Sequence, residues 1–87
     1  MLLDVRPNDE YSLGHLPGAW NIPLRELEQR FSELPSGQEI VAYCRGPYCV
    51  LSFEAVAGLR ARGFQVRRFE EGFPEWKAAD LPVEVAA

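Results

Sequence analysis

The stretch from residue 40 to residue 63 constrains the fold of this chain more than any other part of its sequence. Residues 40–43 are Ile-Val-Ala-Tyr, a β-rich run that follows turn residues at 35–37 and therefore predicts a buried strand. A helix is expected from about residue 50 to residue 62, with Gly63 in the position that ends it. A strand, a short loop and a helix in this order are typical of a parallel sheet whose strands are joined by helices.

The rest of the chain alternates short apolar runs with helical patterns in the same way. Strands are predicted at 2–5, 19–22 and 64–69, a short helical turn at 7–11, helices at 24–34 and 73–79, and a tail at 81–84 that lies on the domain. The helix at 24–34 is expected to bury one apolar stripe, formed by Leu24, Leu27, Phe31 and Leu34. With 87 residues and no repeat or linker, the chain is expected to form one domain over 1–87.

Composition excludes several classes of protein. The formal net charge of −4 argues against a nucleic-acid partner, because binding a polyanion requires clustered lysine and arginine. No apolar run approaches the roughly 20 residues of a membrane-spanning helix, and the first residues lack the features of a secretory signal. We therefore expect a cytoplasmic protein with no membrane partner. Two cysteines and one histidine are too few for a four-ligand zinc site, so no metal site is predicted.

Cys44 directly follows the strand predicted at 40–43. It therefore falls at the carboxyl end of a strand, where parallel sheets bind their ligands. The backbone N–H groups and the dipole of the helix that follows would stabilise a thiolate there, which is the nucleophilic form of cysteine. A buried and inert cysteine is the alternative interpretation. The loop that follows Cys44 favours the nucleophile.

The residues from Cys44 to Cys49 have the length to curl into a nest of inward-pointing amides that holds an anion. Pro47 has no N–H group, so it removes one donor and stiffens the loop. The amides that remain to form this cradle belong to Arg45, Gly46, Tyr48, Cys49 and Val50. The side chain of Arg45 adds local positive charge that the acidic chain as a whole does not supply.

Four other polar or reactive residues have two interpretations each. Cys49 either packs at the start of the helix, which is favoured, or serves as a resolving thiol that forms a disulfide with Cys44. Asp4 and Arg6, at the end of the first strand, form either an ion pair that supports the loop or, as is favoured, a purely structural pair. His15 lies in a tight Gly-His-Leu-Pro-Gly turn, which favours a role in the fold over a catalytic Cys-His dyad.

Three blocks of sequence occur in an order that points to one protein family. The first is Leu3-Asp4-Val5-Arg6 followed by Glu10-Tyr11, Gly14-His15-Leu16-Pro17-Gly18-Ala19 and Asn21-Ile22-Pro23. The second is Tyr43-Cys44-Arg45-Gly46, and the third is Gly72-Phe73-Pro74-Glu75-Trp76 leading to Leu81-Pro82. Together they resemble the rhodanese family of single-domain sulfurtransferases, and the resemblance runs from Leu2 to Glu84. The loop Cys-Arg-Gly-Pro-Tyr-Cys resembles most a subgroup in which a rhodanese domain follows a small winged-helix metalloregulator.

The resemblance implies an α/β fold, namely a rhodanese-like parallel sheet flanked by helices on both faces. It also implies a sulfurtransferase of the thiosulfate type with no cofactor. Cys44 would accept a sulfane sulfur from thiosulfate or a persulfide donor, carry it as a persulfide, and pass it to a thiol or cyanide acceptor. The loop amides from Arg45 to Val50 would cradle the anion, and Arg45 would be the main side-chain contact to the donor.

The loop departs from the pattern of many family members, which leaves the donor open. Pro47 and Cys49 stand where those members have glycine and then serine, threonine or arginine. A redox-sensing or partner-binding module that uses Cys44 and Cys49 without efficient turnover is therefore kept as an alternative. A phosphatase or arsenate reductase is disfavoured, because its seven-residue cradle ends in an arginine that grips the oxyanion, and that position here is Val50.

Overall fold

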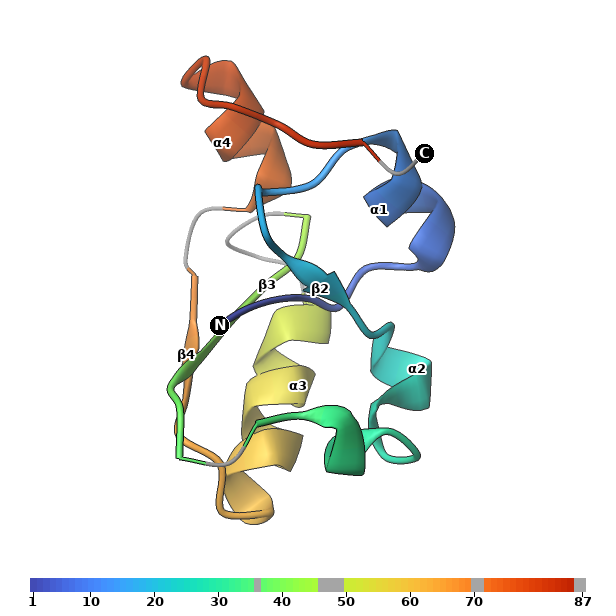
Figure 1. Cartoon of the computed structure of the whole chain (residues 1–87), viewed down its shortest axis with the longest axis vertical. Helices are drawn as coiled ribbons and strands as arrows, with labels where there is room; N and C mark the ends of the chain where they lie inside the picture. The colour runs from blue at the N-terminus through green and yellow to red at the C-terminus, as the bar shows by residue number, and fades with distance from the viewer. Residues whose placement is uncertain (36, 46–49, 70–71, 86–87) are drawn as a thin grey trace.

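The structure, a computed structural model, describes residues 1–35, 37–45, 50–69 and 72–85. In chain order its elements are β1 (Leu2–Asp4), α1 (Asn8–Leu13), β2 (Trp20–Asn21), α2 (Leu24–Leu27), the 3-10 helix η1 (Phe31–Glu33), β3 (Ile40–Tyr43), α3 (Val50–Ala61), β4 (Val66–Arg68) and α4 (Phe73–Ala78). The strands form one parallel sheet in the order β2-β1-β3-β4, with β1 and β3 in the centre (Figure 1). The predicted parallel sheet is confirmed.

Helices cover both faces of this sheet, as predicted, because alternate residues of the central strands point to opposite sides. On one face, Leu3 and Ala42 belong to a core cluster with α2 and α3, to which those helices contribute Leu27, Ala55, Val56 and Leu59. On the other face, Leu2 and Tyr43 pack with α1 and α4, which contribute Tyr11, Phe73 and Trp76. A sheet covered on both faces needs apolar residues at successive strand positions, which explains the continuous apolar run of β3.

The helix predicted for 24–34 is not continuous, so that prediction was wrong for the backbone. The chain leaves the α-helix after Leu27, and the N–H groups of Gln29 and Arg30 donate to carbonyls only three residues back. Arg30 has φ −120° and ψ 15°, outside the helical region, and its guanidinium pairs with both Glu26 and Glu33. The prediction of one apolar stripe is confirmed, since Leu27 and Leu34 belong to one core cluster and Leu24 and Phe31 pack against it.

The end of α3 and the position of the tail at 81–84 agree with the predictions. Gly63 follows α3 with φ +88°, a left-handed conformation that glycine adopts without steric cost. The tail lies on the domain, because His15 and Glu84 exchange two backbone hydrogen bonds of 2.9 Å. Within the described ranges, none of the helices has both the length and the apolar character needed to cross a bilayer.

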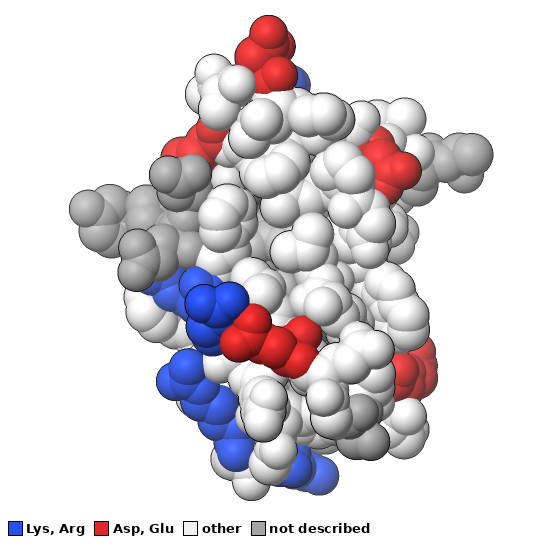
Figure 2. Space-filling model, turned by 60° about the vertical axis from the view of Figure 1, so that its left-hand side comes forward, with Lys and Arg blue, Asp and Glu red and all other residues white. Residues whose placement is uncertain are grey.

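Charge is distributed unevenly over the surface. The left-hand side of Figure 1, where β4 lies, is turned toward the reader in Figure 2, and basic side chains gather on the lower half of that face. Strand β4 contributes Arg67, whose guanidinium pairs with Glu39 at 2.8 Å, and Arg68, which lies 3.9 Å from the ring centroid of Phe53. A net negative charge therefore coexists with local positive regions.

Candidate active site

The candidate site lies where the two central strands end. Asp4 and Tyr43, the last residues of β1 and β3, are register partners, so Cys44 and Val5 leave the sheet side by side. Cys44 is 1% exposed, and its carbonyl accepts a 3.1 Å hydrogen bond from the N–H of Phe73, the first residue of α4. The predicted nucleophile is thus a buried side chain at the carboxyl end of a central strand.

Helix α3 begins at Val50, as the sequence predicted, and its 12 residues direct the positive end of its dipole toward the loop that follows Cys44. Gly46, Pro47, Tyr48 and Cys49 lie outside the described residues. The amide cradle and the second role of Cys49 therefore stay predictions. The described residues that flank this gap are Arg45 before it and Val50 after it.

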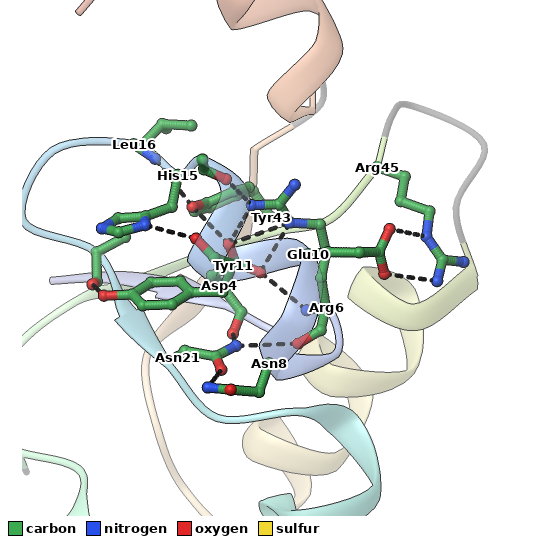
Figure 3. Close-up of polar contacts among 12 residues, drawn as sticks. Asp4, Arg6, Asn8, Glu10, Tyr11, His15, Leu16, Asn21, Tyr43 and Arg45 are labelled. Atoms are coloured by element: carbon green, nitrogen blue, oxygen red, sulfur yellow. Dashed lines mark hydrogen bonds and ion pairs between the residues drawn. The ribbon is translucent and has the colours of Figure 1, made fainter. Parts of the chain in front are cut away.

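Arg45 is held by a carboxylate that the sequence analysis did not assign to the site. Its Nε and Nη2 atoms each lie 2.7 Å from a carboxylate oxygen of Glu10, in α1 (Figure 3). The hydrogen bond from Arg45, followed by its charge, lowers the pKa of Glu10, while partial burial opposes that shift. Both side chains are partly exposed, 54% for Arg45 and 31% for Glu10.

Asp4 and Arg6 form a buried ion pair at the carboxyl end of β1. The guanidinium Nη2 of Arg6 lies 2.7 Å from Oδ2 of Asp4 and donates a 2.6 Å bond to the carbonyl of Gly14 (Figure 3). The guanidinium also lies 4.5 Å from the ring centroid of Phe73. Burial works against the cation, but the hydrogen bonds and charge of Asp4 outweigh it, so the pKa of Arg6 is raised. The pair predicted from the sequence is present, and the guanidinium of Arg6 donates to Asp4 and to the backbone of Gly14.

Tyr43 connects this pair to the turn after α1. Its hydroxyl donates a 2.8 Å hydrogen bond to Oδ2 of Asp4 and accepts a 3.1 Å bond from the N–H of Leu16 (Figure 3). Burial, and then the negative charge of Asp4, raise the pKa of Tyr43, so its hydroxyl stays protonated as a donor. Among the side chains that the structure describes, no buried nitrogen or oxygen lacks a hydrogen-bond partner.

His15 belongs to the turn, as its sequence setting suggested. Its Nδ1 lies 2.8 Å from the carbonyl of Tyr11, to which it donates, and its ring stacks on that of Tyr11 at a centroid distance of 3.7 Å. The hydroxyl of Tyr11 in turn donates to the carbonyl of Ala19 at 2.8 Å. These contacts give His15 a role in holding the turn against α1.

In the described part of the chain, no group of three or more His, Cys, Asp or Glu side chains is placed to hold a metal ion.

The residues that the sequence analysis missed are Glu10, Gly14 and Tyr43, which contact Arg45, Arg6 and Asp4 respectively. Each lies inside or beside the blocks quoted above, but no pattern in the sequence states which side chain faces which. Their roles depend on how α1 and β3 are brought together.

A parallel sheet covered on both faces, with a cysteine at the end of a central strand and a helix behind its loop, is the arrangement of a rhodanese-like domain. The family model described as "Rhodanese-like domain" matches residues 1–79. The chain belongs to this family.

The proteins similar to this chain include a transcriptional regulator and a protein named Sulfurtransferase. The chain is 51% identical over 86 residues to the HTH-type transcriptional regulator Rv0324 of Mycobacterium tuberculosis, covering 99% of this chain and 38% of the regulator. It is 31% identical over 84 residues to a protein of Allochromatium vinosum named Sulfurtransferase, covering 95% of this chain and 77% of that protein. The solved Rhodanese_3 like domain of Alr3790 from Anabaena sp. superposes with a TM-score of 0.86 at 33% identity, covering 99% and 92% of the two chains. Family and relatives support sulfur transfer as the general kind of chemistry.

Proposed function

We propose that this chain is a sulfurtransferase domain that moves a sulfane sulfur from thiosulfate or a persulfide donor to a thiol or cyanide acceptor, through a persulfide on Cys44. The observation that carries the proposal is the place of Cys44, directly after central strand β3 and before the N-terminus of α3, in a chain of the rhodanese-like family. A thiolate or a persulfide is an anion, and this is the position in an α/β fold that favours one.

The reaction divides into two displacements at sulfur. In the first, the thiolate of Cys44 attacks the outer sulfur of thiosulfate, the S–S bond of the donor breaks, and sulfite leaves with the electron pair. In the second, a thiolate or cyanide attacks the terminal sulfur of the Cys44 persulfide, and the thiolate of Cys44 leaves. The product is a new persulfide or thiocyanate, and the enzyme returns to its initial state with no net redox change.

The chain's own groups would assist both steps by holding negative charge. Backbone amides from Arg45 to Val50 are the proposed cradle for the reacting sulfur, and the dipole of α3 adds to them. Asp4, Arg6 and Tyr43 would support the site through the strand ends and would not touch the substrate.

Intact mass of the reduced protein tests this function directly. Treatment with thiosulfate should add one sulfur, and cyanide should then remove that sulfur as thiocyanate. Cys44→Ser should gain no sulfur while keeping the far-UV circular dichroism spectrum of the unsubstituted protein. Sulfur gain by Cys44→Ser, or no gain by the unsubstituted protein with any donor, would exclude the proposal.

A second candidate is favoured by the likeness to a transcriptional regulator, of which this chain spans 38%. In that case the domain would sense redox state or sulfur species, or bind a partner, using Cys44 and Cys49 without efficient turnover. A single sulfur loading, or loss of two hydrogens to a disulfide, with negligible thiocyanate over many equivalents of donor, would favour this sensor over the enzyme.

A further inference from the structure

The side chain expected to contact the sulfur donor is directed at another element of the protein. Two donors of the Arg45 guanidinium, Nε and Nη2, point at the two oxygens of Glu10 with distances of 2.7 Å (Figure 3). Such two-point pairing is the strong geometry for arginine and a carboxylate. Arg45 is adjacent to Cys44, so the partner of Arg45 influences what a substrate at Cys44 meets.

The charge of Arg45 is already balanced by α1. Asp9, next to Glu10 in the first turn of that helix, also contributes to the raised pKa of Arg45, after the hydrogen bond and charge of Glu10. The nearby cation Arg6 is 4% exposed and paired with Asp4, so it is not presented to solvent. A dianion approaching Cys44 therefore meets an arginine whose charge is compensated.

We propose that Glu10 is a specificity-determining residue that disfavours small dianionic donors such as thiosulfate and favours alkyl persulfides, whose reactive protonated form is uncharged, by neutralising Arg45 and holding its guanidinium against α1. The inference rests on the function proposed above. To contact thiosulfate, Arg45 has to exchange one anion, Glu10, for another. An alkyl persulfide makes no such demand, because the protonated form that reacts carries no charge. Glu10 acts through Arg45 and is a positioning residue.

Both donors load the same sulfur onto Cys44, so they can be compared in one assay. With thiosulfate the S–S bond of the donor breaks and sulfite leaves. With 2-hydroxyethyl persulfide in its protonated form, the Cys44 thiolate attacks the outer sulfur and the S–S bond breaks. 2-Mercaptoethanol then leaves as its thiolate, and the proton stays on the new persulfide of Cys44. The two donors differ in their charge and size, whereas the S–S bond that forms on Cys44 is the same.

The test is the rate of one-sulfur gain, followed by intact mass on reduced protein over a series of donor concentrations without acceptor. In Glu10→Gln, the half-saturating concentration of thiosulfate should fall about five- to tenfold, the effect of removing one nearby negative charge from a dianion in a mostly aqueous setting. The maximal loading rate should stay within about twofold, and loading by 2-hydroxyethyl persulfide should not change, since the chemistry at sulfur is untouched.

Glu39→Gln is the matched control. It removes the same charge from another surface arginine pair, Arg67 to Glu39 at 2.8 Å, which lies at the opposite end of β3. It should leave the half-saturating concentration of both donors unchanged. A general effect of net charge would instead move thiosulfate loading equally in both variants.

The outcomes separate the inference from the function on which it rests. If the unsubstituted protein gains sulfur but Glu10→Gln leaves thiosulfate loading unchanged, or changes loading by both donors equally, the role of Glu10 is wrong and the sulfurtransferase stands. If no donor adds sulfur to either protein, both proposals are wrong. A selective gain for thiosulfate supports both.

Discussion

The hydroxyl of Tyr43 donates a 2.8 Å hydrogen bond to Oδ2 of Asp4, joining two fully buried side chains that are 39 residues apart in sequence. This contact ties the carboxyl ends of β1 and β3 together directly beneath Cys44. The same hydroxyl accepts the N–H of Leu16, so it also anchors the turn after α1.

Tyr43→Phe tests how much this hydroxyl contributes to the stability of the domain. The variant leaves the buried N–H of Leu16 without its acceptor and removes one donor from Asp4, so we expect a loss of about 1–3 kcal/mol in the free energy of unfolding. Urea denaturation followed by circular dichroism measures it. Tyr11→Phe is the control, since the hydroxyl of Tyr11 makes one bond in a part-buried place and should cost less. Equal losses would contradict the central role of Tyr43.

Asp4→Asn should be among the most destabilising substitutions at the site. It leaves the guanidinium of Arg6 buried without a countercharge, and breaking one side of a buried pair typically costs about 3–5 kcal/mol. The partly exposed pair of Glu39 and Arg67 provides the comparison, because Glu39→Gln should cost at most about 1 kcal/mol. The urea midpoints of the two variants give the answer, and similar midpoints would show that the buried pair contributes little.

Gly14→Ala should destabilise the domain by crowding. A Cβ atom at residue 14 would lie 2.7 Å from Cζ of Phe73, whose ring also packs against Arg6, so the ring has to shift at a cost of about 1–3 kcal/mol. Gly58→Ala is the matched control, since a Cβ there meets nothing within 4 Å and alanine favours the helix by about 0.5–1 kcal/mol. Thermal melting should therefore move in opposite directions for the two variants. Melting shifts of the same sign would refute the crowding argument.

The pair of Glu10 and Arg45 should contribute to stability only above acidic pH. Hydrogen bonding from Arg45 places the pKa of Glu10 below its ordinary value of 4.5, so folding favours the ionised carboxylate. The contribution is therefore complete above the unfolded-state pKa and disappears as pH falls through the lower folded-state pKa. Both side chains are partly exposed, so we expect less than about 1 kcal/mol at neutral pH. Urea unfolding of the unsubstituted protein and Glu10→Gln at several pH values should show a difference that vanishes in acid. A difference that grows in acid would have the wrong sign.

Cys49→Ser distinguishes the two roles open to the second cysteine. If Cys49 packs at the start of the helix, the variant should keep most of the sulfur transfer from thiosulfate to cyanide, while Cys44→Ser loses it. Thiocyanate release at saturating donor is the measurement. Complete loss in Cys49→Ser, with sulfur still loaded onto Cys44, would make Cys49 an obligatory second thiol.

Much of the fold was predictable because it depends on local patterns. The β-rich run of β3, the boundaries of α3 and the left-handed Gly63 all follow from residues adjacent in sequence. The helix predicted at 24–34 failed for the complementary reason: its apolar spacing reports which side chains are buried and does not fix the backbone between them. After Leu27 the hydrogen bonds join residues three apart instead of four, and the same apolar side chains still face the core.

The sequence by itself determined the alternation of strands and helices, the place of Cys44 at the end of a central strand, and the presence of Asp4 and Arg6 near it. Only the tertiary structure decided that Glu10 holds Arg45, that Tyr43 reaches Asp4, and that Phe73 lies against Gly14 and Arg6. The physical reason is that periodicity and turn residues act over a few positions, whereas these contacts join segments brought together only when the sheet and its helices pack.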